Sequence, residues 1–312
     1  MFCHSIRSLF VATGLFAAGC AIATEQEVVY TARTGDTLIA LEKRFLANPY
    51  VWKNLKTRNR IVDPMRIPVG TPVRIPVGWL RAEPLTARVV AMQGDVSMDG
   101  RALKLDSKVP AGTLLRTGAG AFVTLQMPDE SRLTVQPQSA ARLERLQSVI
   151  GFGGQQTEVF LEHGRVETTV TSQRGPAARY RIRTPTATVG VRGTEFRVGS
   201  DIVAQSSQAE VTGGEVRMSP TDAATPTALP AGYGVVAKAG APIPPPRPLL
   251  PAPSLNGLPE RFERVALRLP FAPVPAAVAY RAQVARDQAF TDVLEDGVFN
   301  TPEARFTGLP DG

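Results

Sequence analysis

The sequence predicts a mainly β protein with one small module at its N-terminal end that mixes helices and strands. Apolar and polar residues alternate repeatedly between residues 79 and 240, for example along Val123–Met127. Helical spacing of apolar residues is clear before residue 60 but absent from 79–240. The 27 glycines and 27 prolines supply the turns that many short strands need. We therefore expect a module with two helices followed by a β domain.

The composition excludes several kinds of functional site. The chain has 312 residues, 43% of them hydrophobic, and a net charge of +7, which is ordinary for a globular protein. Its only cysteines are Cys3 and Cys20, and its only histidines are His4 and His163. Removal of an N-terminal leader would leave no cysteine and one histidine. This excludes a disulfide scaffold, a zinc–thiolate cluster and a cysteine nucleophile, and we expect neither a metal nor a cofactor.

Residues 1–23 have the three-part layout of a secretory signal peptide. Arg7 precedes the apolar run Leu9–Ala18, and Ala21-Ile22-Ala23 matches the small-residue pattern of a cleavage site. The apolar run is shorter than the ~20 residues that a membrane-spanning helix needs. We therefore expect an exported protein of the periplasm or cell envelope, for which nucleic acid is not an expected partner.

A second interpretation of the leader stays open. Ala17-Ala18-Gly19-Cys20 resembles the lipobox of bacterial lipoproteins, in which Cys20 would be lipidated and become the first residue. Position −3 is alanine where leucine is usual. We favour soluble export, and expect membrane contact, as an outer-membrane lipoprotein, only if Cys20 is lipidated.

Residues 24–78 predict a compact strand–helix–helix–strand module. Asp36 and Asn48 are the expected N-caps of the two helices, and Trp52 is expected to pack into the core. The expected elements are a strand at Val28–Ala32, a helix carrying Leu38, Leu41 and Phe45, a helix beginning at Asn48-Pro49, and a strand at Thr71–Ile75. The segment holds nine Lys and Arg against five Asp and Glu, which favours an anionic polymer or surface as its neighbour.

Three stretches of this module, Tyr30–Leu38, Asn59–Pro64 and Gly70–Pro76, closely resemble the LysM domain. The resemblance implies binding of glycans that contain N-acetylglucosamine, in bacteria usually peptidoglycan. It implies a shallow groove between the loop around Gly35 and the loop before the second strand. The glycan-binding candidates carried over by position are Gly35, Asp36, Thr37, Leu38, Asn59 and Ile61.

Each glycan-binding candidate also has a purely structural interpretation. Asp36 and Thr37 would cap a helix in any protein, and Gly35 can simply supply a positive φ. Asn59 can tie the loop to its own backbone, and Ile61 can belong to the core.

Residues 79–240 predict a β-sandwich or an irregular β-solenoid. The pattern Gly-x-Val recurs at Gly94/Val96, Gly164/Val166 and Gly214/Val216, and each copy predicts a tight turn followed by a returning strand. His163 would then lie at the tip of a hairpin. The intervals of 70 and 50 residues between the copies exclude a regular repeat.

Leu114–Gly118, Phe122–Leu125 and, most specifically, Tyr180–Phe196 resemble the FecR domain. The last stretch carries Thr-Pro-x-Ala followed by Val-Arg-Gly-Thr-x-Phe. The namesake proteins relay an iron-siderophore signal across the inner membrane to a sigma factor, using a cytoplasmic domain and a transmembrane helix. We see neither in this sequence, so we carry over only an envelope β domain that contacts proteins. Arg192-Gly193-Thr194 is expected to determine the fold rather than to bind a ligand.

The C-terminal region predicts a spacer and an incomplete domain. Residues 241–258 are rich in proline and predict a semi-rigid linker. Residues 259–312 resemble the first strands of a fibronectin type III-like sandwich, which needs about seven strands. We therefore expect the sandwich to continue beyond Gly312, and these residues to be poorly ordered on their own.

The main functional hypothesis is a non-catalytic envelope protein. It would bind peptidoglycan through the LysM-like module and present the FecR-like domain to an unidentified envelope protein. A signalling receptor or regulator of the envelope is the alternative, and a LysM-targeted cell-wall hydrolase is less favoured. Hydrolysis needs paired carboxylates, a metal or an activated nucleophile, whereas Asp129 and Glu130 are adjacent in a turn and point apart.

Overall fold

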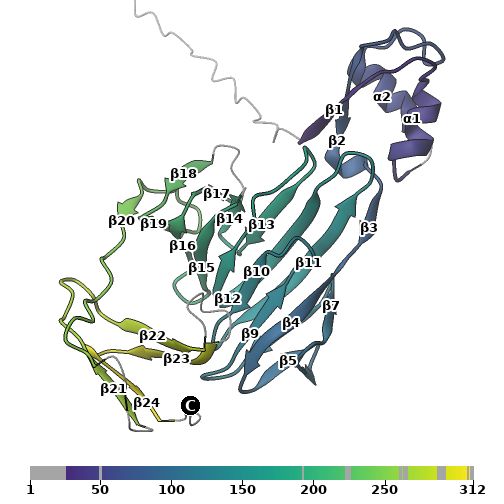
Figure 1. The fold of residues 1–312 in the computed structure, drawn as a ribbon. Helices are drawn as coiled ribbons and strands as arrows, with labels where there is room; N and C mark the ends of the chain where they lie inside the picture. Colours follow the sequence, from purple (N-terminus) through teal and green to yellow (C-terminus); the bar gives the residue numbers. More distant parts are fainter. Residues whose placement is uncertain are drawn as a thin grey trace, which may run out of the picture.

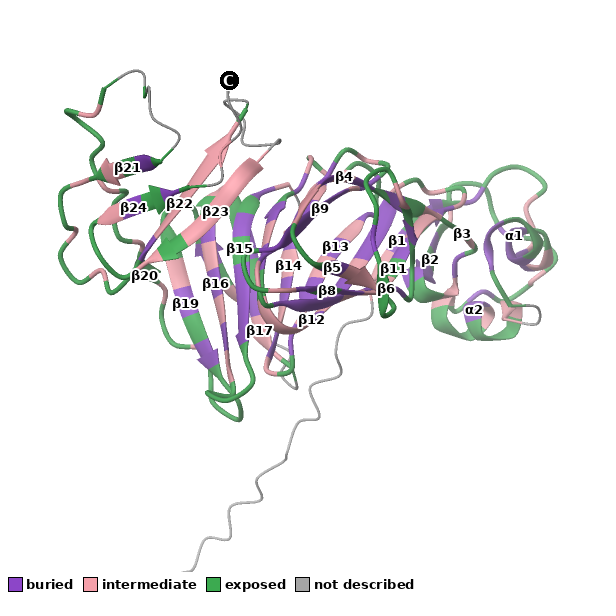
Figure 2. Cartoon of the chain, turned by 90° about the horizontal axis from the view of Figure 1, so that it is seen from below, coloured by how far each residue is buried: buried purple, intermediate pink, exposed green. Residues whose placement is uncertain are grey.

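The structure is a computed structural model that describes residues 26–48, 51–191, 193–221, 226–259, 262, 266–286, 293–307 and 309. The signal peptide predicted for residues 1–23, with Cys20, lies outside the described residues, as does Arg192. An N-terminal module (26–78), a central domain (79–248) and a C-terminal segment (266–309) follow one another, with the module and the C-terminal segment at opposite ends of the central domain (Figures 1 and 2). The predicted mainly β class is confirmed.

The N-terminal module has the predicted order of strand, helix, helix and strand. Strand β1 (Glu27–Thr31) pairs antiparallel with β2 (Pro72–Pro76), and α1 (Leu38–Phe45) and α2 (Trp52–Asn59) lie between them in the chain. Side chains of all four elements meet in one core. The largest fully buried members are Leu38, Leu41, Leu55 and Ile75.

Both predicted helix caps of the module are wrong. Thr37, not Asp36, caps α1, and its Oγ1 accepts a hydrogen bond of 3.0 Å from Ala40 N. Helix α2 begins at Trp52 rather than at Asn48-Pro49. The Trp52 backbone N–H donates to Glu42 Oε1 at 3.2 Å, so a carboxylate of α1 does what the Asn48 side chain was expected to do. Trp52 is half-buried against the core, as predicted.

The central domain consists of two sheets. The first sheet runs in the order β6 (Arg101–Ala102), β5 (Val96–Met98), β8 (Leu114–Thr117), β11 (Ala140–Val149), β12 (Gln155–Thr169), β13 (Arg179–Arg183), β14 (Ala187–Val191), β17 (Glu215–Pro220) and β18 (Thr227–Pro230), with β3 (Ala82–Pro84) also paired to β11. The second runs β7 (Lys108–Pro110), β4 (Thr86–Gln93), β9 (Phe122–Gln126), β10 (Arg132–Val135), β12, β15 (Glu195–Asp201), β16 (Ser206–Gly213), β19 (Tyr233–Lys238) and β20 (Arg247–Pro248).

Strand β12 belongs to both sheets, and Gly164 is the point where it crosses from one to the other. The strand pairs with β11 up to His163, and with β15 from Gly164 onward. Gly164 has a φ of 87°, and a side chain there would collide with Ser139. The hairpin predicted at Gly164 is therefore wrong, and His163 lies within a long strand. The copies at Gly94 and Gly214 do precede returning strands, β5 and β17.

One hydrophobic core fills the space between the two sheets (Figure 2, purple). Successive strand pairs alternate between them, because β13–β14 and β17–β18 lie in the first sheet and β15–β16 lies in the second. The domain thus has the two layers of a sandwich and a chain path that advances like a solenoid. Its largest fully buried side chains include Tyr180, Phe196, Leu125, Leu133 and Leu143.

The C-terminal segment forms two small antiparallel sheets, β21 (Leu267–Pro270) with β24 (Glu303–Phe306) and β22 (Tyr280–Ala285) with β23 (Val293–Phe299). Leu267, Ala304 and Phe306 are the buried centre of its own small core. The segment also contacts the central domain through Arg281, which the sequence analysis did not anticipate. Neither helix in the described part of the chain is long and apolar enough to cross a membrane.

Candidate functional site

The two loops that the sequence assigns to a glycan groove meet in the module. Leu38 N, just after the first loop, donates a hydrogen bond of 2.9 Å to the carbonyl oxygen of Pro64 in the second. Gly35 lies exposed at the turn of the first loop with a φ of 82°, and no other heavy atom lies within 4 Å of the position that a Cβ would take. The backbone around Gly35 is therefore open to a ligand.

The side chains of Asp36 and Thr37 hold the first loop in shape. Asp36 Oδ2 accepts hydrogen bonds from Tyr30 Oη at 2.8 Å and from Arg33 N at 2.6 Å. Burial raises the pKa of the Tyr30 hydroxyl, and the hydrogen bond to Asp36 raises it further. Tyr30 therefore stays protonated and donates to Asp36 at neutral pH, while Thr37 caps α1.

The other three predicted site residues stabilise the module. The Leu38 side chain is fully buried, and Ile61 is also part of the core. Asn59 ties α2 to β2, since its Nδ2 donates to Leu55 O and Arg74 O, both at 2.9 Å, and its Oδ1 accepts from Arg74 N at 2.7 Å. Contacts to a glycan from these three residues would have to come from backbone groups.

An exposed apolar edge on the second loop was missed by the sequence analysis. Val62, Met65 and Val69 are 89%, 62% and 67% exposed. Apolar side chains left in water beside a candidate groove are the kind of surface that packs against the faces of sugar rings. The sequence could have indicated this edge, because these three apolar residues lie in a predicted loop and follow neither a helical nor a strand periodicity.

The module and the central domain share part of their cores. Phe152, from the loop between β11 and β12, reaches into the module, and its ring centroid lies 5.0 Å from that of Phe45 and 6.4 Å from that of Tyr30. Val149 and Ala177 of the central domain are buried in the same cluster. The two parts therefore form a continuous packed unit.

Hydrogen bonds also cross this junction. The guanidinium of Arg81 donates to the backbone oxygen of Lys43 at 2.8 Å. Gln26 accepts from Arg179 Nε at 2.8 Å and donates to the backbone oxygen of Pro176 at 3.2 Å. These bonds restrict rotation of the module about the short connection to β3.

The outer surface of the first sheet is rich in arginine. We call it the arginine face, and it comprises Arg116, Arg142, Arg145, Arg179, Arg181, Arg183 and Arg217, with Glu144, Glu158, Glu162 and Glu215 among them. The glutamates pair with some of these arginines, for example Glu158 with Arg145 at 3.2 Å. Seven cations against four anions leave the face with an excess of positive charge.

Arg179, the first residue of β13, is a partly buried member of this face. Burial lowers the pKa of Arg179 to about 10, and the neighbouring Arg181 contributes to the decrease. A negatively charged partner placed beside Arg181 would relieve this repulsion. The arginine face is thus suited to an acidic surface.

His163 lies at a cavity on the corner of β12, and Asp129 lies in a turn. His163 lines a shallow cavity of about 610 Å³ at the corner of β12, together with Ser200 and Asp201. Within the described ranges no group of three or more His, Cys, Asp and Glu side chains could hold a metal ion. Asp129 accepts from Ser131 N at 3.1 Å and from Gln173 Nε2 at 2.8 Å, in the turn where the sequence predicts it.

Several motif residues between 184 and 196 are buried. Thr184 is buried, and its Oγ1 accepts from Ala187 N at 2.9 Å and from Ser207 Oγ at 2.7 Å. Thr194 and Phe196 are also buried, and Gly193 has a φ of 98°. These residues therefore shape the fold, as the sequence analysis expected for Gly193 and Thr194.

The family model for the FecR protein matches residues 113–217, from the start of β8 into β17. This stretch is a FecR domain. Every arginine of the arginine face lies within the FecR domain, so the excess positive charge belongs to it. No curated protein matches the chain.

Two crystal structures of a candidate anti-sigma factor from Parabacteroides distasonis are similar to part of the chain. They share 17% and 16% sequence identity with it, and the TM-scores are 0.36 and 0.35. In each case the alignment covers 43% of this chain and 59% of the other, which is less than two thirds of that protein's length. A similarity of this degree supports no functional assignment beyond the FecR domain itself.

Proposed function

We propose that this chain is a non-catalytic regulator of signalling in the cell envelope, and that its FecR domain binds a partner protein through the arginine face. The family match over residues 113–217 carries the proposal. FecR proteins transmit signals by protein contacts, and the export signal expected at residues 1–23 would bring this chain to the envelope.

The geometry of the FecR domain supports a protein partner. The motif residues Thr184, Thr194 and Phe196 are buried and cannot contact a partner. A partner protein would therefore contact other side chains, on the outer surfaces of the sheets. Arg181 has no carboxylate partner among the described residues, and it lies in the middle of β13 on the arginine face. Complementary charge speeds association and excludes wrong partners, so an acidic protein surface is the expected contact.

Gene-expression profiles in the native host test this proposal. A deletion strain would be complemented with the wild-type chain, with Arg181→Glu, or with Arg88→Glu. Arg88 is an exposed arginine of the second sheet, paired with Asp106, and serves as the matched control. We expect deletion and Arg181→Glu to change the same small set of transcripts and Arg88→Glu to behave as wild type. Unchanged transcript levels after deletion would refute the signalling role. If Arg181→Glu complements the deletion as well as the wild-type chain does, the arginine face is not used.

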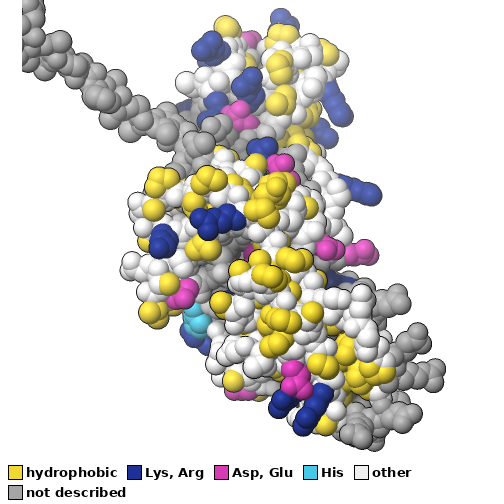
Figure 3. Space-filling model, turned by 90° about the vertical axis from the view of Figure 1, so that its left-hand side faces the viewer, with side chains coloured by type: hydrophobic (Ala, Val, Ile, Leu, Met, Phe, Trp, Pro, Cys, Tyr) yellow, Lys and Arg dark blue, Asp and Glu magenta, His cyan; other side chains and the backbone are white. Residues whose placement is uncertain are grey.

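A second function, glycan binding by the module, is favoured by a separate observation. The hydrogen bond from Leu38 N to Pro64 O brings the two predicted groove loops together, with open backbone at Gly35 and the apolar edge beside it. Lys and Arg side chains gather over the module (Figure 3, top). We propose peptidoglycan in the periplasm as the ligand, which would hold the signalling domain at the cell wall.

Sedimentation of the full chain with purified peptidoglycan tests this second function. Hydrogen bonds and apolar contacts survive salt, so binding should persist in about 0.3 M NaCl, where exposed charge attraction is largely screened. Val62→Ser should weaken it. Val203→Ser, at a position 96% exposed in the central domain, should not. Complete loss of binding in salt, or equal behaviour of the two variants, would contradict a groove.

A further inference from the structure

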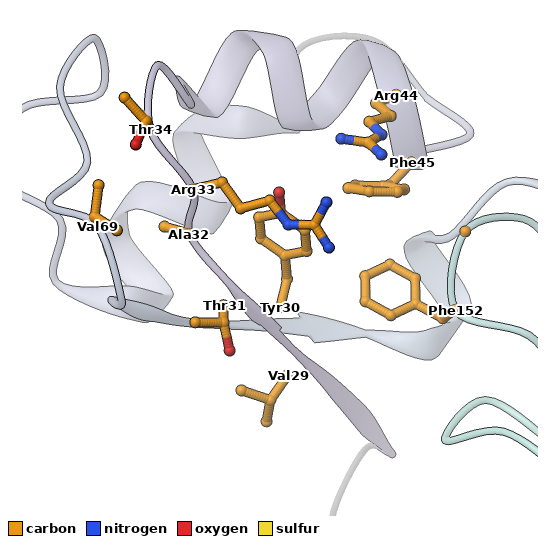
Figure 4. A pocket seen from close by; sticks show the side chains of 11 residues that line it. Val29, Tyr30, Thr31, Ala32, Arg33, Thr34, Arg44, Phe45, Val69 and Phe152 are labelled. Carbon is orange, nitrogen blue, oxygen red and sulfur yellow. The ribbon is translucent and has the colours of Figure 1, made fainter.

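A cavity of about 620 Å³ lies at the junction of the module and the central domain (Figure 4). The module contributes β1, the loop after it, the end of α1 and Val69, and the central domain contributes Gly151 and Phe152. This volume lies within the ~300–1,000 Å³ range of small-molecule sites. Both parts line the cavity, and neither Leu38 nor Pro64 is among its lining residues.

Three aromatic rings form one side of the cavity. Phe45 lies between Tyr30 and Phe152, with ring centroids 5.3 Å and 5.0 Å away, and the rings are tilted against one another. Gly151 has a φ of 82°, and a side chain there would collide with the Phe45 ring. The aromatic side is therefore held in place from both parts of the protein.

Two guanidinium groups reach toward the same opening. Arg33 extends across the space between Tyr30 and Phe152, and Arg44 lies above Phe45 with its Cζ 4.9 Å from the ring centroid (Figure 4). Neither arginine pairs with a carboxylate in the part of the chain that the structure describes. The carboxylate on the same loop, Asp36, accepts instead from Tyr30 Oη and Arg33 N. Two like charges beside one opening favour an anion between them.

We propose that this junction cavity binds an acidic sugar. Its carboxylate would lie between the guanidinium groups of Arg33 and Arg44, and the apolar face of its ring would pack against Phe45 and Phe152. Thr31 and Thr34 line the same cavity and offer hydroxyl groups to the hydroxyls of a sugar. The proposal goes beyond the signalling and glycan-groove functions and depends on neither, because the arginine and phenylalanine side chains that would contact the sugar acid belong to neither site; Val69 of the apolar edge also lines the cavity.

Two matched pairs of sugars, titrated into the full chain and followed by NMR, test the proposal. Methyl β-D-glucuronide differs from methyl β-D-glucoside by a carboxylate, as does N-acetylmuramic acid from N-acetylglucosamine. We expect the acid of at least one pair to bind about tenfold more tightly than its neutral partner, because a carboxylate bound by two guanidinium groups is charge-assisted. The ring signals of Tyr30, Phe45 and Phe152 should shift on binding.

Variants separate this site from general positive charge. The double variant Arg33→Gln/Arg44→Gln should abolish the preference for the acid. Lys43→Gln removes the same kind of charge from the next position on α1, which is exposed and outside the cavity, and should keep the preference. Phe152→Leu keeps all charges and should weaken both sugars of the preferred pair, and thermal melting would show that each variant is folded.

Three results would overturn the proposal. Equal affinity for acid and neutral sugar in both pairs would show that the arginines do not bind a carboxylate. If inorganic phosphate displaces the sugar acid at equal concentration, the site is a cationic patch that does not recognise the sugar ring. Loss of the preference in Lys43→Gln would show that net charge, rather than the cavity, produces it.

Discussion

Arg281 of the C-terminal segment donates a hydrogen bond of 2.9 Å from Nη1 to Glu167 Oε2 on β12. Its Nη2 donates to Gln136 Oε1 at 2.7 Å, and Asp296 on β23 holds the same guanidinium from the other side. The Asp296 side chain is only 3% exposed. One arginine thus joins the C-terminal segment to the second sheet of the central domain.

Arg281→Gln should loosen this docking. The Arg281–Glu167 pair is partly exposed, so its loss should cost about 1 kcal/mol of docking free energy, in addition to the loss of the Arg281–Asp296 pair within the segment. Hydrogen exchange should quicken across Tyr280–Ala285, while exchange in β13 stays unchanged. Arg305→Gln, which removes an exposed pair with Glu303 inside the segment, is the control. If the two variants exchange alike across 280–285, Arg281 does not dock the segment.

The docking should also depend on pH. Burial acts to raise the pKa of Glu167, but Arg281 and Arg197 outweigh it and hold this pKa below its ordinary value of 4.5. A carboxyl group whose pKa is lowered by folding stabilises the folded state above its unfolded pKa and loses that contribution as the pH falls through its folded pKa. Docking should therefore be complete near pH 7 and weaken below about pH 4. The measurement is hydrogen exchange of 280–285, corrected for intrinsic rates. In Glu167→Gln the exchange rate of 280–285 should no longer rise as the pH falls. If the rise persists in this variant, another group causes it.

Gly151→Ala should separate the module from the central domain. The substitution meets two obstacles, a positive φ and the ring of Phe45. Gly153→Ala is a matched control, because Gly153 has a φ of 68° and no other heavy atom within 4 Å of its Cβ position. Backbone strain alone costs about 1–2 kcal/mol, and the collision should add about 1–3 kcal/mol to Gly151→Ala. Denaturant unfolding would compare the free energies of unfolding of the two variants. Equal losses of stability would show that the junction accommodates a side chain at Gly151.

Gly164→Ala should disrupt the crossing of β12 between the sheets. Its positive φ is shared by Gly112, where no other heavy atom lies near the Cβ position, whereas at Gly164 a side chain meets Ser139. Gly112→Ala should cost about 1–2 kcal/mol, and Gly164→Ala at least about 2 kcal/mol more. The test is the midpoint of urea unfolding of the full chain. Similar midpoints would show that β12 can cross without a glycine.

Local sequence patterns were sufficient to predict many of the strands and the first helix. Alternation placed the strands around Val123, Leu133 and Ile182, and helical spacing placed α1, because each pattern depends on which face of one element is buried. The path of β12 was not predictable in this way. The local sequence at Gly164 is typical of a turn. The strand continues because Gly164 pairs with Ser200 on β15 and lies so close to Ser139 that a side chain would not fit.

The candidate sites show the same limit. Gly35 and Thr37 were predicted from a local motif, and glycan binding at their loop stays a prediction. The cavity of Arg33, Arg44 and Phe152 was missed because it joins segments far apart in the chain, and no periodicity within either segment records their contact. Asp36 was wrongly predicted to cap α1, whose N-cap is the next residue, Thr37, because the Asp36 carboxylate instead accepts hydrogen bonds from Tyr30 on β1 and from Arg33 N.

Photo-crosslinking in the native host tests most directly whether the FecR domain binds a protein through its arginine face. A photoreactive residue would replace Arg181 on that face or, as a control, Arg88 on the second sheet. We predict a crosslink to one protein from position 181 but not from 88, weakened when Arg116→Glu is added on the same face. A crosslink of equal yield from both positions, no crosslink from position 181, or a yield that Arg116→Glu leaves unchanged would contradict the account.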